Sequence, residues 1–228
     1  MEISKDLRHW QPARFPDSRT LEGRFVRLEK LDCSRHGDDL WRVVQGPGSD
    51  PKLFDYMLCG PFLDRTEFDS WLTERAAGTD PWAYAVVDQK TGVVHGSLTL
   101  RSLVPDHGRA EIGSVIFGAG MQRTPKSTET LYLLAKEAFA LGNRRLEWLC
   151  GTENARSRRA AQRFGFRLEG IHRQRLILKD KSIDDMFYAM MDHEWPALQR
   201  ALEAWLAVEN FDETGRQKRT LEEFQSLG

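Results

Sequence analysis

This chain of 228 residues has no long apolar run, only three cysteines and no excess of one charge sign. No stretch reaches the roughly eighteen apolar residues of a membrane span, and the opening segment MEISKDLRHW has no apolar centre of the kind that secretion signals carry. The cysteines Cys33, Cys59 and Cys150 are too few and too far apart for a disulfide framework, and none has zinc-ligand spacing. We therefore expect a cytoplasmic protein without a metal, whose cysteines serve packing.

Positive and negative charges are balanced, with 33 Lys and Arg against 34 Asp and Glu and a formal net charge of −1. This balance argues against attraction of the whole protein to nucleic acid. One local basic cluster has the spacing of a solvated helix side; it consists of Arg156, Arg158, Arg159 and Arg163. Ordinary surface is the stronger interpretation and a nucleic-acid module on that helix the weaker one, so we expect neither a nucleic-acid nor a membrane partner.

Residues 121–142 open with a polar loop and continue as a helix. Pro125 pre-sets helical φ near the start, and Ser127 and Thr128 are placed to satisfy or cap free amides. Apolar residues then recur at helical spacing until Gly142, namely Leu131, Leu134, Ala135, Ala138 and Phe139. Free amides at a helix start attract anions by roughly 0.3 to 1 kcal/mol per charge, so this entrance is a candidate anion site.

A strand and a second helix follow. Leu146, Trp148 and Cys150 alternate with their neighbours as a strand packed through one face would. Asn154 then stands at an N-cap position, and Gly165 occupies the C-terminal position that a left-handed turn favours.

This order of loop, helix, strand, helix and Gly-Phe turn resembles the GNAT superfamily of N-acetyltransferases. The resemblance implies that acetyl-CoA binds at the first helix. The family's loop has small glycine positions where this chain has Pro125 and Ser127, and Pro125 removes one amide donor. The loop residues implied to bind the cofactor are Gln122, Arg123, Thr124, Pro125, Lys126, Ser127 and Thr128.

The second helix carries the resemblance further, because Asn154, Ser157 and the Gly165-Phe166 pair match the family's ending. Many members have a tyrosine that protonates the departing thiolate, where this chain has Ala161. The RimL-like branch of ribosomal-protein N-terminal acetyltransferases commonly has a serine three residues after this asparagine, and Ser157 resembles it. This resemblance implies that Ser157 is the acid and contacts the cofactor with Asn154. An equally open alternative is that Ser157 bonds the backbone of the first helical turn.

Three antiparallel strands are predicted upstream, at residues 82–87, 93–100 and 110–117. In the resembling family the third of these strands pairs with the pantetheine arm, which maps onto Val115 and Phe117. If that strand splays from the one containing Trp148, a crevice opens beyond their carboxyl ends, where a linear ligand can lie as an added strand.

Two charged positions have candidate roles. Glu111 is our candidate base, acting directly or through water, although proximity alone can contribute about 7 to 11 kcal/mol and a base is then dispensable. A surface or salt-bridged glutamate is the more common case, and binding of a cationic acceptor is a further alternative for Glu111. The resemblance also implies that Arg158 or Arg159 faces the 3′-phosphate of CoA, and we select Arg159.

Outside this region the patterns predict a first strand after Gly23 and helices at residues 33–44 and 66–77. The Gly- and Pro-rich segment between the helices is predicted as a loop, with Phe54, Tyr56 and Met57 available for an acceptor wall or for core packing.

Near the C-terminus, a hairpin is predicted from strands at residues 171–179 and 186–191, joined by the turn KDKSIDD. Residues 1–20 form an arm, residues 21–192 the acetyltransferase-like domain, and residues 193–228 a helical extension. The extension's apolar stripe must either dock back on the chain or join subunits.

The sequence thus predicts an α+β fold with a mixed, mostly antiparallel sheet that is splayed at an acyl-CoA crevice and flanked by helices. The resemblance implies acetyl-CoA-dependent transfer to a primary amine, on a protein N-terminus or a small molecule, by a monomer or homodimer. Because Pro125 and Ala161 depart from the family pattern, the alternative is a catalytically degenerate acyl-CoA-binding sensor or scaffold.

Overall fold

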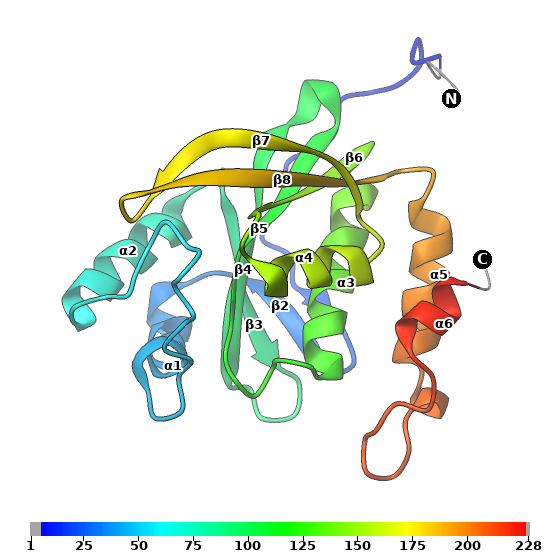
Figure 1. Cartoon of the computed structure of the whole chain (residues 1–228). Coiled ribbons are helices and arrows are strands. Elements are labelled where there is room, and N and C mark those ends of the chain that lie inside the picture. The colour runs from blue at the N-terminus through cyan, green and yellow to red at the C-terminus, as the bar shows by residue number, and fades with distance from the viewer. Residues whose placement is uncertain (1–5, 227–228) are drawn as a thin grey trace.

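An eight-stranded sheet forms the centre of the computed structural model, which describes residues 6–226 (Figure 1). Its order is β1-β2-β3-β4-β5-β6-β8-β7, and every neighbouring pair is antiparallel except β5 with β6. The strands are β1 (Leu21–Glu22), β2 (Val26–Lys30), β3 (Trp82–Asp88), β4 (Val94–Val104), β5 (Arg109–Phe117), β6 (Arg145–Gly151), β7 (Arg167–Leu178) and β8 (Lys181–Met191). The helices are α1 (Cys33–Gln45), α2 (Arg65–Ala77), α3 (Pro125–Ala140), α4 (Ala155–Arg163), α5 (Trp195–Leu206) and α6 (Leu221–Gln225), and Pro105–His107 and Val208–Asn210 form 3-10 turns. The predicted mixed, mostly antiparallel α+β fold is confirmed.

Both faces of the sheet are covered, and β3 shows this most clearly because its residues after Trp82 are all buried. Ala83 and Ala85 pack into the hydrophobic cluster that contains α1 and α2. Tyr84 and Val86, on the opposite face, belong to the larger cluster with α3, α4 and α5. Successive strand residues point to opposite faces, so an uninterrupted apolar run fits a strand with helices on both sides.

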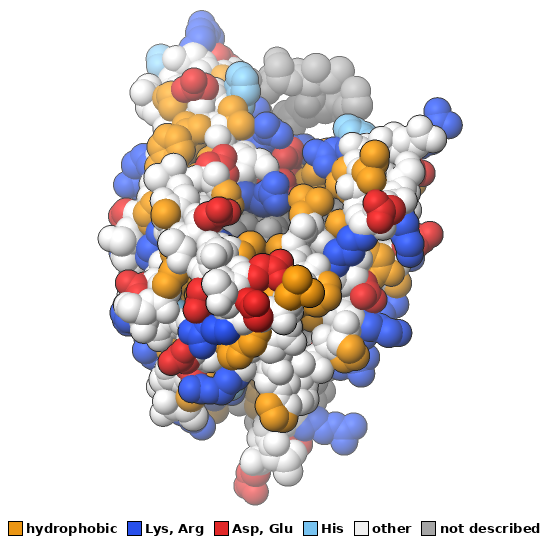
Figure 2. Space-filling model, turned by 90° about the vertical axis from the view of Figure 1, so that its left-hand side faces the viewer, with side chains coloured by type: hydrophobic (Ala, Val, Ile, Leu, Met, Phe, Trp, Pro, Cys, Tyr) orange, Lys and Arg blue, Asp and Glu red, His pale blue; other side chains and the backbone are white. Residues whose placement is uncertain are grey.

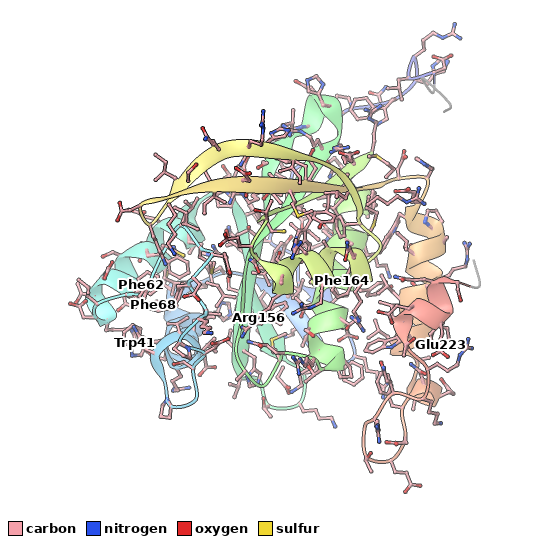
Figure 3. All side chains as sticks on the ribbon, viewed as in Figure 1. Trp41, Phe62, Phe68, Arg156, Phe164 and Glu223 are labelled. Atoms are coloured by element: carbon pink, nitrogen blue, oxygen red, sulfur yellow. The ribbon has the colours of Figure 1, made fainter. Side chains whose placement is uncertain are left out.

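Aromatic side chains fix α2 against α1 and the loop between them (Figure 3). The ring of Phe62 lies 5.4 Å from that of Phe68 and 5.0 Å from that of Trp71, and the ring of Trp41 lies 5.3 Å from that of Phe68. Such pairs contribute about 0.5 to 1.5 kcal/mol each beyond their burial. They give α2 a fixed position beside the sheet.

The helix α3 is tied to the sheet through a buried carboxylate. Glu129 is 4% exposed, and its two oxygens accept hydrogen bonds from the backbone N–H groups of Arg24, Phe25 and Val26 at 2.6–2.8 Å. These donors precede or begin β2, so one side chain fixes the helix relative to the edge of the sheet. Hydrogen bonds to a charged acceptor are among the stronger ones in proteins.

The hairpin of β7 and β8 differs from the prediction, which placed a seven-residue turn at KDKSIDD. The turn consists of Lys179 and Asp180, whose φ angles are 48° and 65°, and Ser182 and Ile183 already pair with β7. Two residues with positive φ are typical of a tight hairpin turn. The polar composition was misleading because the first residues of β8 extend beyond β6 and pair only with the edge strand β7, where they are exposed or half-buried, so their pairing requires no apolar pattern.

The C-terminal extension docks on its own chain. The ring of Trp195 in α5 stacks on that of Phe139 in α3, with centroids 5.2 Å apart, and Leu202 and Trp205 are buried in the same cluster. At the other end, Ala13 bonds the carbonyl of Pro105. The first five residues of the predicted arm and the last two of the extension lie outside the described residues.

The surface of the described residues carries mixed charge. Figure 2 shows Lys, Arg, Asp and Glu side chains interspersed over one face, with small hydrophobic groups between them. Within residues 6–226, no group of three or more His, Cys, Asp or Glu side chains is arranged to hold a metal ion. No described helix combines the length and apolar composition that crossing a bilayer requires.

Replacing Glu129 by alanine leaves the three backbone donors before β2 without their acceptor. We expect Glu129→Ala to lower the free energy of unfolding by about 3 to 5 kcal/mol. Urea unfolding followed by circular dichroism measures the change, with Glu209→Ala at an exposed position as the control. If the urea concentration at the midpoint of unfolding equals that of the unaltered protein, Glu129 does not anchor α3.

Candidate active site

The parallel pair β5 and β6 comes apart in mid-sheet. Its register covers only Arg109 with Arg145, Ala110 with Leu146 and Glu111 with Glu147, although both strands continue further. Beyond these pairs the two strands enclose a cavity of about 440 Å³, which the segment from Tyr56 to Cys59 and the β7–β8 hairpin also line. The facing edge of β5 is left available to an extended ligand. The predicted splay of the sheet is thereby confirmed.

A kink in β5 accompanies this opening. Ser114 has a φ of 48°, and the register with β4 shifts between Ser97 and Thr99. The carbonyl of Ser114 accepts a hydrogen bond of 2.9 Å from Nη2 of Arg75 in α2. An arginine on the fixed helix α2 therefore holds the strand at its irregular point.

The helix α3 follows β5 and begins with uncapped amides. Its N-cap residue Thr124 makes no side-chain cap, because its hydroxyl donates to the carbonyl of Met121 at 2.7 Å, and the hydroxyl of Ser127 donates to the carbonyl of Thr124 at 2.9 Å. Pro125 has no N–H, which leaves the amides of Lys126 and Ser127 as open donors at the positive end of the helix dipole.

Two other candidate residues of this segment, Thr128 and Lys126, already have partners within the chain. Thr128 is 2% exposed, and its hydroxyl accepts a hydrogen bond from Arg163 at 3.1 Å. Lys126 pairs with Asp88 at 2.5 Å. Burial works to raise the pKa of Asp88, but Lys126 and the amides of Thr91 and Lys90 outweigh it and hold that pKa well below its usual range. The side chain of Lys126 is thus already engaged within the chain.

Gln122 and Arg123 are exposed, and Arg123 has a φ of 61°. The side-chain amide of Gln122 donates to the carbonyl of Phe117 at 3.3 Å, which ties the loop to the end of β5. Val115 lines the cavity, whereas Phe117 is half-buried at the strand end. The structure therefore places the candidate loop and the candidate strand positions side by side.

The start of α4 brings Ser157 to the cavity. Asn154 caps the helix by accepting from the amide of Ser157 at 3.1 Å, as its predicted N-cap position requires. The hydroxyl of Ser157 accepts a hydrogen bond of 2.8 Å from Nε1 of Trp148 in β6. That bond uses an oxygen lone pair, so the hydroxyl proton is directed away from Trp148, and Cys150 lies within its hydrogen-bonding reach; Ser157, Trp148 and Cys150 all line the cavity.

The sequence reasoning missed this role of Trp148, which it treated as a packing residue. The signal was present, because a buried tryptophan usually finds an acceptor for its N–H and this one precedes a helix start with serine in its first turn. Cys150 lies beside the same hydroxyl, and burial raises the pKa of its thiol, which keeps it neutral.

Glu111 lies at the end of the paired part of β5 and lines the same cavity. The residue is 9% exposed, and its carboxyl accepts from the hydroxyl of Ser102 at 3.0 Å and lies 3.8 Å from Nε of Arg101. Burial raises the pKa of Glu111, and the charge of Arg101 and the bond from Ser102 offset this only in part. A carboxylate with a raised pKa is a better proton acceptor than an ordinary surface glutamate.

The loop between α1 and α2 closes one side of the cavity. It is fastened by Tyr56, whose hydroxyl donates to the carbonyl of Glu153 at 3.2 Å, and by Lys179, whose ammonium donates to the carbonyl of Phe54 at 2.6 Å. Arg156, labelled in Figure 3, pairs with Asp50 of the loop at 2.6 Å. Of the two uses considered for the loop, core packing is confirmed for Phe54, which is buried, while Tyr56 and Met57 line the cavity and their use as an acceptor wall stays a prediction.

The basic residues of α4 do not act as one patch. Arg156 is paired with Asp50, and Arg163 is directed inward, with its guanidinium 5.2 Å from the ring of Trp205. Arg159 is exposed, and Arg158 is half-buried with an Nε that has no partner among the described residues. Neither of the latter two lines the cavity.

Comparison with known proteins places this site in a family. Residues 35–167 match the family model described as an acetyltransferase (GNAT) domain. The chain belongs to the GNAT superfamily: it is an N-acetyltransferase of the class that uses acetyl-CoA as co-substrate. Among proteins of curated function, no sequence matches it.

Solved structures agree with this assignment. A GCN5-related N-acetyltransferase from Brucella melitensis is 42% identical, with 96% of this chain and 100% of that chain covered and a TM-score of 0.93. A GNAT-family protein from Chromobacterium violaceum is 37% identical, with 86% of this chain and 98% of that chain covered and a TM-score of 0.81. The structure of RimL, a ribosomal L7/L12 alpha-N-protein acetyltransferase, is 20% identical, with 76% of this chain and 94% of that chain covered and a TM-score of 0.67. This likeness shows a shared fold, and it does not establish the predicted RimL-like branch.

The geometry fits the CoA part of the co-substrate. The open amides of Lys126 and Ser127 would hold the pyrophosphate, and the unpaired edge of β5 at Val115 would receive the extended pantetheine arm. These donors belong to the backbone, so they are present although this chain has Pro125 and Ser127 in place of the family's glycines.

Ser127 occupies the first turn of α3, where a glutamate suits the helix but sets a negative charge against a bound pyrophosphate. We expect Ser127→Glu to raise the Kd for acetyl-CoA at least about tenfold, equivalent to about 1.4 kcal/mol. Isothermal titration calorimetry measures it, with Ser70→Glu on the exposed side of α2 as the matched control. Equal affinity in the two variants would place the pyrophosphate elsewhere.

Proposed function

We propose that this protein transfers the acetyl group of acetyl-CoA directly to a primary amine, on a protein N-terminus or on a small molecule. The observation that carries the proposal is a single cavity, at the parting of β5 and β6, that both Glu111 and Ser157 line. One side chain can accept a proton and the other can donate one, as amide formation at the expense of a thioester requires.

Glu111 would take the proton from the acceptor ammonium, directly or through a water. Its raised pKa supports this role because the proton acceptor then lies closer in strength to the amine. The neutral amine forms the new C–N bond as the C–S bond of acetyl-CoA breaks. Holding the reacting groups in line contributes about 7 to 11 kcal/mol in favourable cases, so the enclosed shape of the site does much of the catalysis.

Ser157 would donate its hydroxyl proton to the departing sulfur. The indole N–H of Trp148 occupies a lone pair of the Ser157 oxygen, which orients the O–H bond away from Trp148 and makes the hydroxyl a better donor. Trp148 is thus a positioning residue for Ser157. The absence of tyrosine at Ala161 is consistent with this assignment.

Ser157→Ala removes the proposed acid. We expect kcat to fall about 100-fold, within the range for lost general acid–base catalysis, while the Kd for acetyl-CoA changes little. Thiol release during amine acetylation measures kcat, calorimetry measures the Kd, and Ser34→Ala at an exposed position of α1 is the control. Full activity in Ser157→Ala would assign the proton donor to water instead.

Glu111 predicts a pH dependence whose sign follows from its raised pKa. A base must be deprotonated, so kcat should fall as the pH drops through a pKa above the ordinary glutamate range. Glu111→Gln should lower kcat about 100-fold and remove this acidic limb. If the variant instead raises only the KM for the amine and keeps the limb, Glu111 binds the acceptor and is not the base.

Acetyl-CoA binding without acetylation of any amine would contradict the proposal and favour the sensor or scaffold. An amine screen with acetyl-CoA, followed by mass spectrometry of the products, makes this distinction. Peptides with free N-termini and small primary amines belong in the same screen, because the two acceptor types give products of different mass.

A further inference from the structure

The cavity is lined by more positively than negatively charged side chains. The charged residues that line it are Arg75, Arg101, Arg175, Glu111 and Asp185. Arg175 pairs with Asp185 at 3.0 Å, and Arg101 approaches Glu111 at 3.8 Å. Arg75 forms no ion pair with any Asp or Glu of the described residues, so one guanidinium is left without a counter-ion.

Arg75 is also deeply buried, with 8% of the residue exposed. Its Nη2 donates to the carbonyl of Ser114 at 2.9 Å and to the hydroxyl of Ser97 at 3.4 Å, whereas its Nε has no partner within residues 6–226. Burial lowers the pKa of Arg75 to about 10, and the charge of Arg101 acts in the same direction. Arg75 therefore stays cationic at neutral pH.

Nothing else in the described chain neutralises this cation. The neighbouring Cys59 is not a counter-ion, because burial raises the pKa of its thiol. The ring of Trp71, 5.2 Å from the guanidinium, offers a weaker cation–π contact. A buried charge without a partner costs free energy, and an anionic ligand in the cavity would supply the missing counter-ion.

A second guanidinium reaches the same space from β4. The side chain of Arg101 crosses β5 at Gly113, where an added Cβ would come within 2.6 Å of its Cδ. Its side chain is 38% exposed, and its charge acts on that of Arg75. Two arginines and one carboxyl of raised pKa thus share one wall of the cavity.

We propose that the acceptor is a small amine that carries an oxyanion, a carboxylate or a phosphate, in the same molecule. Arg75 and Arg101 bind the oxyanion, and the amine lies toward Glu111. Guanidinium groups suit both anions because their planar N–H donors match the spacing of the oxygens. This inference rests on the proposed acetyl transfer to an amine and narrows its acceptor to a small amino acid or amino phosphate.

The size of the site and the loop along one side of it support a small acceptor. The cavity of about 440 Å³ must also hold the acetyl end of the co-substrate, and Tyr56 and Lys179 fasten the loop that closes it. The N-terminus of a protein would have to enter past this loop, and it brings an amide carbonyl where the arginines call for an anion.

The test compares amines that differ only in the anion. Glycine is paired with methylamine, L-alanine with ethylamine, L-phenylalanine with 2-phenylethylamine, and O-phosphoethanolamine with ethanolamine. The remaining proteinogenic amino acids are assayed as well. Thiol release at saturating acetyl-CoA gives kcat/KM, calculated on the concentration of neutral amine so that differences in amine basicity do not enter. We expect at least a tenfold preference for the anionic member of an accepted pair, and the phosphate pair distinguishes the two oxyanions.

Variants assign that preference to the arginines. Arg101→Gln should lower kcat/KM for the anionic acceptor at least tenfold, mainly through KM, and leave the KM for acetyl-CoA unchanged. Arg75→Lys, which keeps the charge but loses the planar fork, should also raise the KM for the anionic acceptor; because Arg75 holds β5 through Ser114, its KM for acetyl-CoA is measured too, and Arg101→Gln carries the assignment. Arg65→Gln, a half-buried arginine at the start of the same helix α2 that does not line the cavity, is the control. Thermal unfolding of each variant shows whether the fold is intact.

The outcomes separate this inference from the function beneath it. Amines acetylated as well without the anion as with it, or variants that lose activity equally toward both members of a pair, overturn the oxyanion site and leave the acetyltransferase proposal standing. Binding of acetyl-CoA without acetylation of any amine in the panel, peptides included, overturns both.

Discussion

The separation of β5 from β6 after Glu111 is the constraint on which the rest of the site depends. A parallel pair that stayed closed would satisfy the edge of β5 and fill the space between the strands. Because the pair opens, the strand edge is free, and Glu111 and Trp148 face a common cavity. The helices α3 and α4 follow β5 and β6 directly, so the N-termini of both point to the carboxyl end of the parallel pair, where open α/β sheets bind ligands.

The two proposed binding sites use different chemistry. The proposed acetyl-CoA site consists largely of backbone, namely the edge of β5 beside the cavity and the amides of Lys126 and Ser127 at the start of α3, and backbone donors depend little on side-chain identity. The proposed acceptor site consists of side chains from separate elements, with Arg75 from α2, Arg101 from β4 and Glu111 from β5. On this proposal the family determines the co-substrate, and individual residues of the cavity determine the acceptor.

Local periodicity was sufficient to predict most elements of the fold. The helices α1, α2 and α3 and the strands β3 to β6 lie within a few residues of their predicted positions, because most of them bury an apolar face with a clear repeat and β3 is an apolar run of strand length. The hairpin turn was misplaced, since the polar start of β8 has no such repeat.

The candidate site was predictable where it follows from one element, as with Asn154 capping α4. It was not predictable where it depends on contacts between distant segments. Arg75 meets Ser114 across 39 positions of sequence, and nothing near Arg75 shows that it will be buried without a carboxylate. Trp148 pairs with Ser157 only because β6 and α4 fold together at the cavity.

The most direct test of this account is hydrogen–deuterium exchange of backbone amides with and without acetyl-CoA. The account predicts slower exchange on binding in two places, the free edge of β5 around Val115 and the first turn of α3 at Lys126 and Ser127, with little change in α1 and α5. Protection that spares both segments, or appears only on the exposed side of β7, would contradict the claim that the opening between β5 and β6 receives the co-substrate.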